Sequence, residues 1–340
     1  MKSFVLARSR QILSLLLLLA LAGLVIWLGS QKNFGPRQYA QLALDGVRAG
    51  TIYALIALGL VTIYNVTEVI NFAQGAFVML GAMVTADLFA QASLPFTPGL
   101  NLLAAALLAT LLTTALGLIM ERLVIFPVRD ASPMTLIIIT VGVYIVLQGV
   151  ALIIWGAGAL KIPAFATFLT GGRRDAVFRP LGIIVKAQSF WIWGTTALVM
   201  GVLYWFFNHT IQGKAFQAAA VNRTAARLMG ISPNRMSLFA FGVAAALGAI
   251  AGIVLGPVTS PTYDMGLKLG LKGFVAAIMG GLVNAPAAVL GGVLLGVVEN
   301  LAAGVTKAGL KDVFAFVILI LVLLYRPQGL LSQAKETEKV

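Results

Sequence analysis

The sequence lacks cysteine, and it has little charge and only one histidine. Without cysteine the chain can form no disulfide, thiolate metal site or iron–sulfur cluster. Charged residues make up 10% of the 340 positions, against about 25% in a soluble domain, so the chain cannot cover a water-facing surface. The 24 Lys and Arg residues outnumber the 11 Asp and Glu residues and lie scattered between apolar runs. Without a basic stripe and interleaved aromatics, this charge predicts contact with lipid headgroups and no nucleic-acid binding.

Motifs for catalysis are also missing. The sequence contains no phosphate loop of the form Gly-x-x-x-x-Gly-Lys-Ser/Thr, no His-x-x-x-His, no Gly-x-Ser-x-Gly and no pair of carboxylates on one helix face. His209 stands where an apolar run ends and has no partner ligands, so we interpret it as an interfacial residue. We therefore expect no metal, no cofactor and no enzymatic activity in this chain, and we set aside a membrane-embedded enzyme.

Apolar residues are abundant instead, at 60% of the chain with a mean hydropathy of +0.99. A helix needs roughly 20 apolar residues to cross a membrane, and ten runs approach this length. They are Ile12–Leu28, Ala43–Tyr64, Gln74–Phe89, Leu100–Met120, Met134–Trp155, Phe190–Phe207, Leu238–Pro257, Phe274–Val283, Ala285–Ala303 and Val313–Tyr325. The third, eighth and tenth runs are short, which predicts re-entrant or broken helices. The expected fold is an all-α polytopic membrane bundle of about ten transmembrane or re-entrant helices, forming one domain over residues 1–340.

The first run has two interpretations. Lys2, Arg8 and Arg10 followed by Ile12–Leu28 are compatible with a cleaved signal peptide. The apolar stretch is longer than a typical signal core, and no Ala-x-Ala site follows before Gln31, so we favour a retained signal-anchor helix within residues 11–30. The distribution of basic residues over all loops does not decide the orientation. The flanks of the first helix favour a cytoplasmic N-terminus, and an even number of crossings then makes the C-terminus cytoplasmic too.

Small residues recur every four positions in three of the runs. In lipid, such faces let helix backbones approach closely and gain dispersion contacts. The three sets are Gly46, Gly50 and Ala54; Gly248, Gly252 and Gly256; and Ala288, Gly292 and Gly296. They predict a compact bundle with helices in close contact.

Ionisable residues within membrane spans are candidates for function. Asp45, Arg48, Asp87 and Glu299 fall in or beside the runs, and we place all four near span ends, where they can reach water. Asp45 and Arg48 are three positions apart, so they can form an ion pair on one helix face. The placement leaves no carboxylate near the midplane, where a proton- or sodium-coupled carrier usually buries one.

Two amides begin the short third run. Asn71 and Gln74 are three positions apart and share a face, and polar amides facing lipid would be costly. One hypothesis is that both line the substrate path. The alternative is that Asn71 caps the N-terminus of the helix.

The loop Asn208–Ser237 contains a possible docking element. Ala218, Val221, Ala225 and Leu228 fall on one face of a predicted helix Ala218–Met229, which Gly230 ends. Such a helix is too short to span a membrane. It could lie in the headgroup region or fit a groove on another protein, and its alanine-rich face favours the protein partner.

Four segments resemble a known family. Gly213–Ser232, with the sequence GKAFQAAAVNRTAARLMGIS, is similar to the cytoplasmic loop of permease subunits in ABC importers for branched-chain amino acids. The segments INFAQGAFVMLG from Ile70, KGFVAAIMGGL from Lys272 and YRPQGL from Tyr325 are similar to the same family, in the same order. The resemblance covers about Ala40 to Leu331, and it implies that the loop at 208–237 is a cytoplasmic coupling loop.

Two parts depart from the family pattern: the leading helix Ile12–Leu28 and the basic loop Gly156–Ser189. The five cations of that loop are Lys161, Arg173, Arg174, Arg179 and Lys186. If the loop faces outward, Arg173 and Arg174 would attract a soluble binding protein with acidic lobes. The alternative is a solvated loop near anionic lipid headgroups.

The resemblance implies a transmembrane permease subunit of an ABC importer in the bacterial inner membrane, surrounded by membrane lipid. Its implied substrate is a branched-chain amino acid, or a related small polar solute such as urea or an amide. Its implied partners are two ATP-binding subunits, a second permease that is a copy or a homologue, and a soluble substrate-binding protein. ATP would be bound by the partner subunits. The alternative from another class is a stand-alone secondary carrier or facilitative channel.

Overall fold

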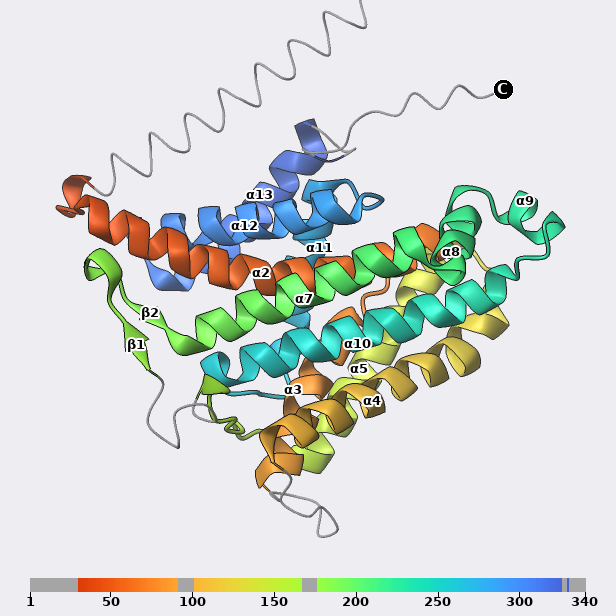
Figure 1. Cartoon of the computed structure of the whole chain (residues 1–340), viewed down its shortest axis with the longest axis horizontal. Helices are drawn as coiled ribbons and strands as arrows, with labels where there is room; N and C mark the ends of the chain where they lie inside the picture. Colours follow the sequence, from red (N-terminus) through yellow and green to blue (C-terminus); the bar gives the residue numbers. More distant parts are fainter. Residues whose placement is uncertain (1–29, 91–100, 167–175, 326–328, 330–340) are drawn as a thin grey trace, which may run out of the picture.

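The computed structural model describes residues 30–90, 101–166, 176–325 and 329, which are mostly helical (Figure 1). The predicted helix Ile12–Leu28 lies outside the described residues. The α-helices are α2 (Pro36–Thr67), α3 (Gln74–Ala90), α4 (Leu102–Met120), α5 (Pro133–Trp155), α7 (Ala187–His209), α8 (Ile211–Val221), α9 (Arg223–Leu228), α10 (Pro233–Thr259), α11 (Met265–Gly280), α12 (Ala285–Val305) and α13 (Lys311–Tyr325). Strands β1 (Val177–Phe178) and β2 (Val185–Lys186) form an antiparallel hairpin.

Six helices in the described part of the chain are long and apolar enough to cross a membrane. They are α2, α4 with its continuation to Val128, α5, α7, α10 and α12. Helices α3, α11 and α13 are shorter, with 17, 16 and 15 residues. The structure confirms an all-α polytopic bundle, and each predicted run after the first corresponds to a helix. It does not confirm a count of about ten spans, because these three helices are below spanning length.

Helices α2 and α12 pack backbone against backbone. A Cβ atom added to Gly50 would lie 2.6 Å from both the carbonyl oxygen of Gly292 and the Cα of Val293. A Cβ at Gly46 would lie 2.8 Å from the carbonyl oxygen of Gly296. Two of the predicted small-residue faces thus pack against each other, because only hydrogen at these positions allows so close an approach.

The third small-residue face lies mainly against α3. Gly248 and Gly252 of α10 abut Phe77 and Val78, whereas Gly256 abuts Ile162. Helix α3 begins inside the bundle, where the fully buried Gln74 lies beside Gly59 of α2. The short third run is therefore a helix whose N-terminus is surrounded by protein, as expected for a broken membrane segment.

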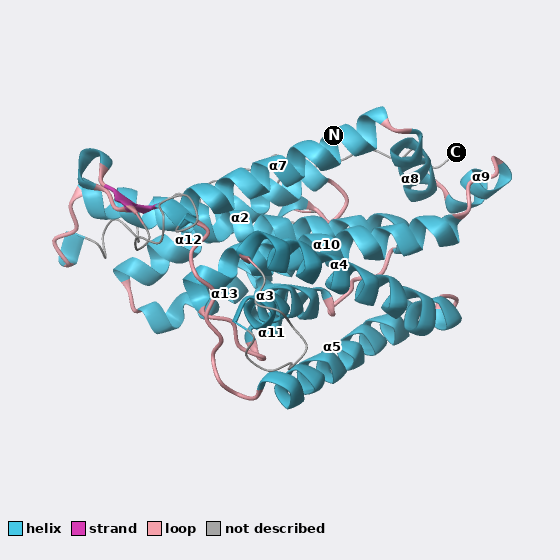
Figure 2. Ribbon diagram, turned by 60° about the horizontal axis from the view of Figure 1, so that its bottom comes forward, coloured by secondary structure: helices cyan, strands magenta, loops and turns pink. Residues whose placement is uncertain are grey.

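The bundle has two distinct ends. Helix α7 runs from the β1–β2 hairpin to α8, and Figures 1 and 2 show the hairpin and the α8–α9 segment at opposite ends of the long helices. Helix α10 follows α9 directly, and its 27 residues carry the chain about 40 Å. Its last residue, Thr259, therefore lies at the hairpin end. We call these the hairpin end and the α8–α9 end.

The outer helices present apolar side chains outward. Helices α4, α5 and α7 are much less buried than α2 and α10. Their exposed large side chains include Leu107, Leu111, Ile138, Ile153, Leu198 and Trp205. In a membrane these side chains would contact lipid, which stabilises them without a protein partner.

Candidate functional site

A charged pocket of about 340 Å³ lies at the hairpin end, between α2, α10, α11, α12 and α13. Its size falls in the range typical of small-molecule sites, about 300–1,000 Å³. The charged residues that line it are Asp45, Arg48, Asp264, Lys268, Lys272, Lys311 and Asp312. Apolar side chains complete the wall, among them Ile52, Leu255, Met265 and Leu269. So many charges around one pocket are unusual in an apolar bundle and mark it as a functional candidate.

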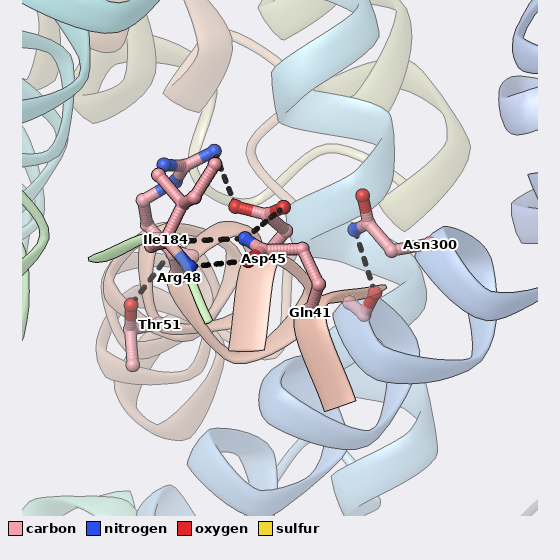
Figure 3. A network of polar contacts seen from close by, with 7 residues as sticks. Gln41, Asp45, Arg48, Thr51, Ile184 and Asn300 are labelled. Atoms are coloured by element: carbon pink, nitrogen blue, oxygen red, sulfur yellow. Dashed lines mark hydrogen bonds and ion pairs between the residues drawn. The ribbon is translucent and has the colours of Figure 1, made fainter. Parts of the chain in front are cut away.

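Asp45 and Arg48 form the first ion pair of the pocket, with 3.0 Å between Nη2 and Oδ1 (Figure 3). This confirms the predicted pairing along one face of α2. Gln41 donates a hydrogen bond of 3.0 Å from Nε2 to the other carboxylate oxygen of Asp45. The same amide also exchanges hydrogen bonds with the backbone of Ile184, beside β2. The pair is thus held between α2 and the hairpin, and one edge of the pocket is fixed.

Lys272 of α11 lies between two carboxylates. Its Nζ is 2.5 Å from Oε1 of Glu299 on α12 and 2.7 Å from Oδ1 of Asp312 on α13. The hydroxyl of Tyr53 is 3.5 Å from the same Nζ. Glu299 has 0% exposure and Lys272 is buried, whereas Asp312 is about half exposed. This cluster joins α2, α11, α12 and α13, and Tyr53, Lys272 and Asp312 of the cluster line the pocket.

The buried cluster corrects the expectation that Glu299 reaches water at a span end. Glu299 lies six residues before the end of α12, but α2, α11 and α13 cover this part of the helix. Lys272 was missed because the predicted run began at Phe274, whereas α11 begins at Met265. Lys268 and Lys272, four positions apart, lie on one face of that longer helix. The spacing of these two lysines was the sequence signal that could have identified them, but it indicates a shared face only if the helix is predicted to begin before Lys268.

Asp87 was also expected to reach water, and this prediction was wrong. The residue is 1% exposed near the end of α3, and its Oδ1 has no hydrogen-bond partner among the described residues. Its neighbours Thr85, Ala86 and Leu88 are buried as well. Position near a helix end therefore did not imply solvent contact.

The two predicted path amides lie in the bundle interior. Asn71 and Gln74 are fully buried and do not line the charged pocket. The Oδ1 of Asn71 accepts a hydrogen bond from the backbone N–H of Ala73, so this side chain caps the turn that leads into α3. Gln74 donates from Nε2 to the carbonyl oxygen of Ala244 at 2.9 Å. The Nδ2 of Asn71 and the Oε1 of Gln74 have no hydrogen-bond partner in the described structure.

The predicted docking helix Ala218–Met229 is two helices. Helix α8 ends at Val221, Asn222 adopts an extended conformation, and its Oδ1 accepts hydrogen bonds from the N–H groups of Thr224 and Ala225 to begin α9. The single-helix prediction was therefore wrong. An asparagine that caps a new helix competes with continuation of the old one.

The break leaves the candidate docking residues exposed. Val221 and Leu228 are 87% and 84% exposed, and Ala218, Ala225 and Gly230 are exposed as well. Gly230 adopts a positive φ of 81° and ends the segment, as predicted. The exposed surface of α8 and α9, which we call the α8–α9 surface, thus combines apolar side chains such as Val221 and Leu228 with the cations Arg223 and Arg227, and it lies at the far end of the bundle from the charged pocket.

The described part of the basic loop lies at the hairpin end. Lys161, Arg179 and Lys186 are exposed there, while Arg173 and Arg174 lie outside the described residues. The described part of the loop and the α8–α9 surface therefore lie at opposite ends of the bundle.

A bundle of long apolar helices, with exposed apolar side chains on its outer helices and a charged pocket at one end, defines a polytopic membrane protein. Comparison with known proteins gives the family. The family model described as branched-chain amino acid transport system / permease component matches residues 42–323. The chain belongs to this family.

Three relatives illustrate the similarity. The high-affinity branched-chain amino acid transport system permease protein BraD of Pseudomonas aeruginosa is 35% identical, over 89% of this chain and 98% of its own. The permease protein LivH of Escherichia coli K12 is 32% identical, with the same coverage. The permease protein LivM of Salmonella typhimurium is 26% identical, over 90% of this chain and 73% of its own.

Proposed function

We propose that the chain is the transmembrane permease subunit of an ABC importer that moves branched-chain amino acids into the cell. The observation that carries this proposal is the pairing of a charged pocket at one end of the bundle with exposed apolar side chains, Val221 and Leu228, on the α8–α9 surface at the other. The names of BraD and LivH support the substrate class. A family of permeases also fits the expectation that the chain is not an enzyme.

The α8–α9 surface is the proposed docking site for an ATP-binding subunit. Val221 and Leu228 offer apolar side chains to a groove, and Ala218, Ala225 and Gly230 let the partner approach closely. ATP would bind only to the partner, so this chain needs no cofactor. Closure of two such partners around ATP would move α8–α9 and shift the bundle between outward-open and inward-open states.

A second permease and a soluble binding protein complete the proposed assembly. Similarity to both LivH and LivM supports a homologous permease as the second subunit. The binding protein would dock at the hairpin end, where Arg179 and Lys186 are exposed; the proposal keeps Arg173 and Arg174, from the same loop of the sequence, as candidate contacts. This places the hairpin end outside and the α8–α9 end in the cytoplasm of a bacterial inner membrane. Gly329 packs against Gly281 at the end of α11, which supports a cytoplasmic C-terminus, and we place the N-terminus on the same side.

The substrate path would pass Asn71 and Gln74. In the described state one donor, Nδ2 of Asn71, and one acceptor, Oε1 of Gln74, are buried without partners. Such atoms are costly in an apolar interior. An open state that presents both to a passing zwitterion would satisfy them.

Reconstitution tests the proposal. The full complex in proteoliposomes, with binding protein outside and ATP inside, should accumulate L-leucine, L-isoleucine or L-valine only when ATP is hydrolysed. A stand-alone carrier predicts uptake by this chain alone, without copurifying ATPase subunits. ATP-independent leucine uptake by the isolated chain would overturn the importer proposal.

A further inference from the structure

We propose that the charged pocket at the hairpin end is a binding site for a zwitterionic α-amino acid, entered from outside. The inference rests on the proposed function and deepens it, because it assigns named residues to the two charged groups of the substrate. Lys268 and Lys311 hold the carboxylate, Asp264 accepts from the ammonium, and the apolar wall receives the side chain.

The internal ion pairs of the pocket decide which charges remain for a ligand. Arg48 is matched by Asp45, and Lys272 is shared between Glu299 and Asp312. Lys268, Lys311 and Asp264 also line the pocket but have no ion pair within 4.0 Å among the described residues. Two cations and one carboxylate therefore remain open to a ligand.

The open charges match a zwitterion in kind, and the charges of the whole site match its net charge of zero. The carboxylate of an amino acid has two oxygens, and each can accept a charge-assisted hydrogen bond from a lysine ammonium. With Glu299 included, the four cations and four carboxylates of the site cancel. A neutral zwitterion preserves this balance, whereas a ligand with net charge would leave one charge uncompensated in a partly buried site, which is costly.

The apolar part of the pocket indicates the side chain. Ile52 of α2, Leu255 of α10 and Leu269 of α11 line the pocket beside the charges. Burying an aliphatic side chain against such a wall is favourable, because it removes apolar surface from water. The pocket thus combines the two features that a branched-chain amino acid requires, a polar end and an aliphatic end.

Thiol protection tests the site directly, because the chain contains no cysteine. Thr262 lines the pocket, so the Thr262→Cys variant in the assembled complex would be labelled from outside by a membrane-impermeant maleimide. L-Leucine at ten times its dissociation constant should slow this labelling roughly tenfold, because only about one site in eleven is then empty. The analogues 3-methylbutylamine, which is leucine without its carboxylate, and 4-methylpentanoate, which is leucine without its ammonium, should protect poorly. Labelling is read on this chain after the subunits are separated.

Matched controls identify the residues. Lys268→Gln or Lys311→Gln in the Thr262→Cys background should weaken protection by L-leucine about tenfold or more, the usual effect of losing a hydrogen bond to a charged group. Lys307→Gln removes an exposed cation near the start of α13 that does not line the pocket, and it should leave protection unchanged. Thr306→Cys provides a thiol outside the pocket lining that leucine should not protect.

The outcomes separate this inference from the proposed function. If the wild-type complex accumulates leucine with ATP, but leucine protects the Thr262 position equally in the Lys268→Gln, Lys311→Gln and Lys307→Gln backgrounds, the pocket assignment is wrong and the importer stands. Equal protection by either analogue would exclude zwitterion recognition. If Thr262→Cys does not assemble, Val258→Cys reports on the same pocket. Absence of protection at both positions also overturns the site.

Discussion

The Nζ of Lys272 lies 2.5 Å from a carboxylate oxygen of Glu299, with both side chains buried between α11 and α12. Taking two such charges from water is expensive, and only their mutual attraction offsets the cost. The second oxygen of Glu299 has no hydrogen-bond partner in the described structure. Replacing one member of the pair by an apolar residue should therefore lower the stability of the complex more than replacing both.

Lys272→Met should destabilise the complex by about 3–5 kcal/mol, because it leaves the Glu299 carboxylate buried and unpaired. The double variant Lys272→Met/Glu299→Leu should recover much of this loss. Thermal unfolding of the solubilised complex measures both. Arg129→Met provides the control, since its ion pair with Asp130 is exposed and worth at most about 1 kcal/mol. A single variant as stable as the double would contradict the expectation.

Gly50→Leu should prevent close packing of α2 on α12. The new side chain would meet the backbone of Gly292 and Val293, which cannot move aside as a flexible side chain can. Overpacking typically costs about 1–3 kcal/mol, so assembly yield and melting temperature should fall. Gly142→Leu on α5, where nothing lies within 4 Å of an added Cβ, should leave both unchanged.

The ATP-binding subunits should bind this chain more weakly in each of three variants: Val221→Glu, Ala225→Glu and Leu228→Glu. Each places a charge on the exposed α8–α9 surface, and a charge buried without a partner in an interface is unfavourable. Copurified ATPase should decrease, or ATP hydrolysis should continue without transport. Lys307→Glu, on an exposed residue at the hairpin end, should keep both normal. Normal yield and uptake in all three α8–α9 variants would rule out docking there.

Gln74→Leu tests the path through the bundle. The change removes the hydrogen bond to the carbonyl oxygen of Ala244, which should cost about 1 kcal/mol of stability. If Gln74 lines the path, the relative uptake of leucine, isoleucine and valine should change as well. A lower melting temperature with unchanged substrate preference would leave Gln74 with a structural role only.

Arg173→Glu combined with Arg174→Glu should lower uptake when binding protein is limiting. Removing positive charge slows the association of an acidic partner, and added salt should reduce the difference from wild type. ATPase activity without binding protein should not change. Equal uptake at low and high salt would assign the basic loop to solvent or lipid headgroups.

The long helices were predictable because apolar runs and helix length are directly related in a membrane protein. The contact between α2 and α12 was partly predictable too, since Gly46, Gly50, Gly292 and Gly296 recur at the spacing of one helix face. The structure was needed to show which small-residue face packs against which. Sequence spacing shows that a backbone can be approached closely, but it does not name the partner helix.

The charged pocket was not predicted, for a physical reason. Its residues come from helices far apart in the sequence, and no local pattern records that Lys272 meets Glu299. The start of α11 was hidden by Lys268 and Lys272, whose charges end an apolar run even though they lie within the helix. The break at Asn222 was not predicted either, because the alanines around it favour one continuous helix.

Helix α7 connects the two ends of the molecule without interruption. Its 23 residues extend about 34 Å from the hairpin to α8, and Gly213 of α8 packs directly against the backbone of Phe206 and Phe207. A continuous helix resists bending and stretching. The close contact of Gly213 with Phe206 and Phe207 also holds α8 against the C-terminal end of α7. Helix α7 therefore links the hairpin to the α8–α9 surface as one continuous helix, so a rigid-body movement of α7 would displace both ends together.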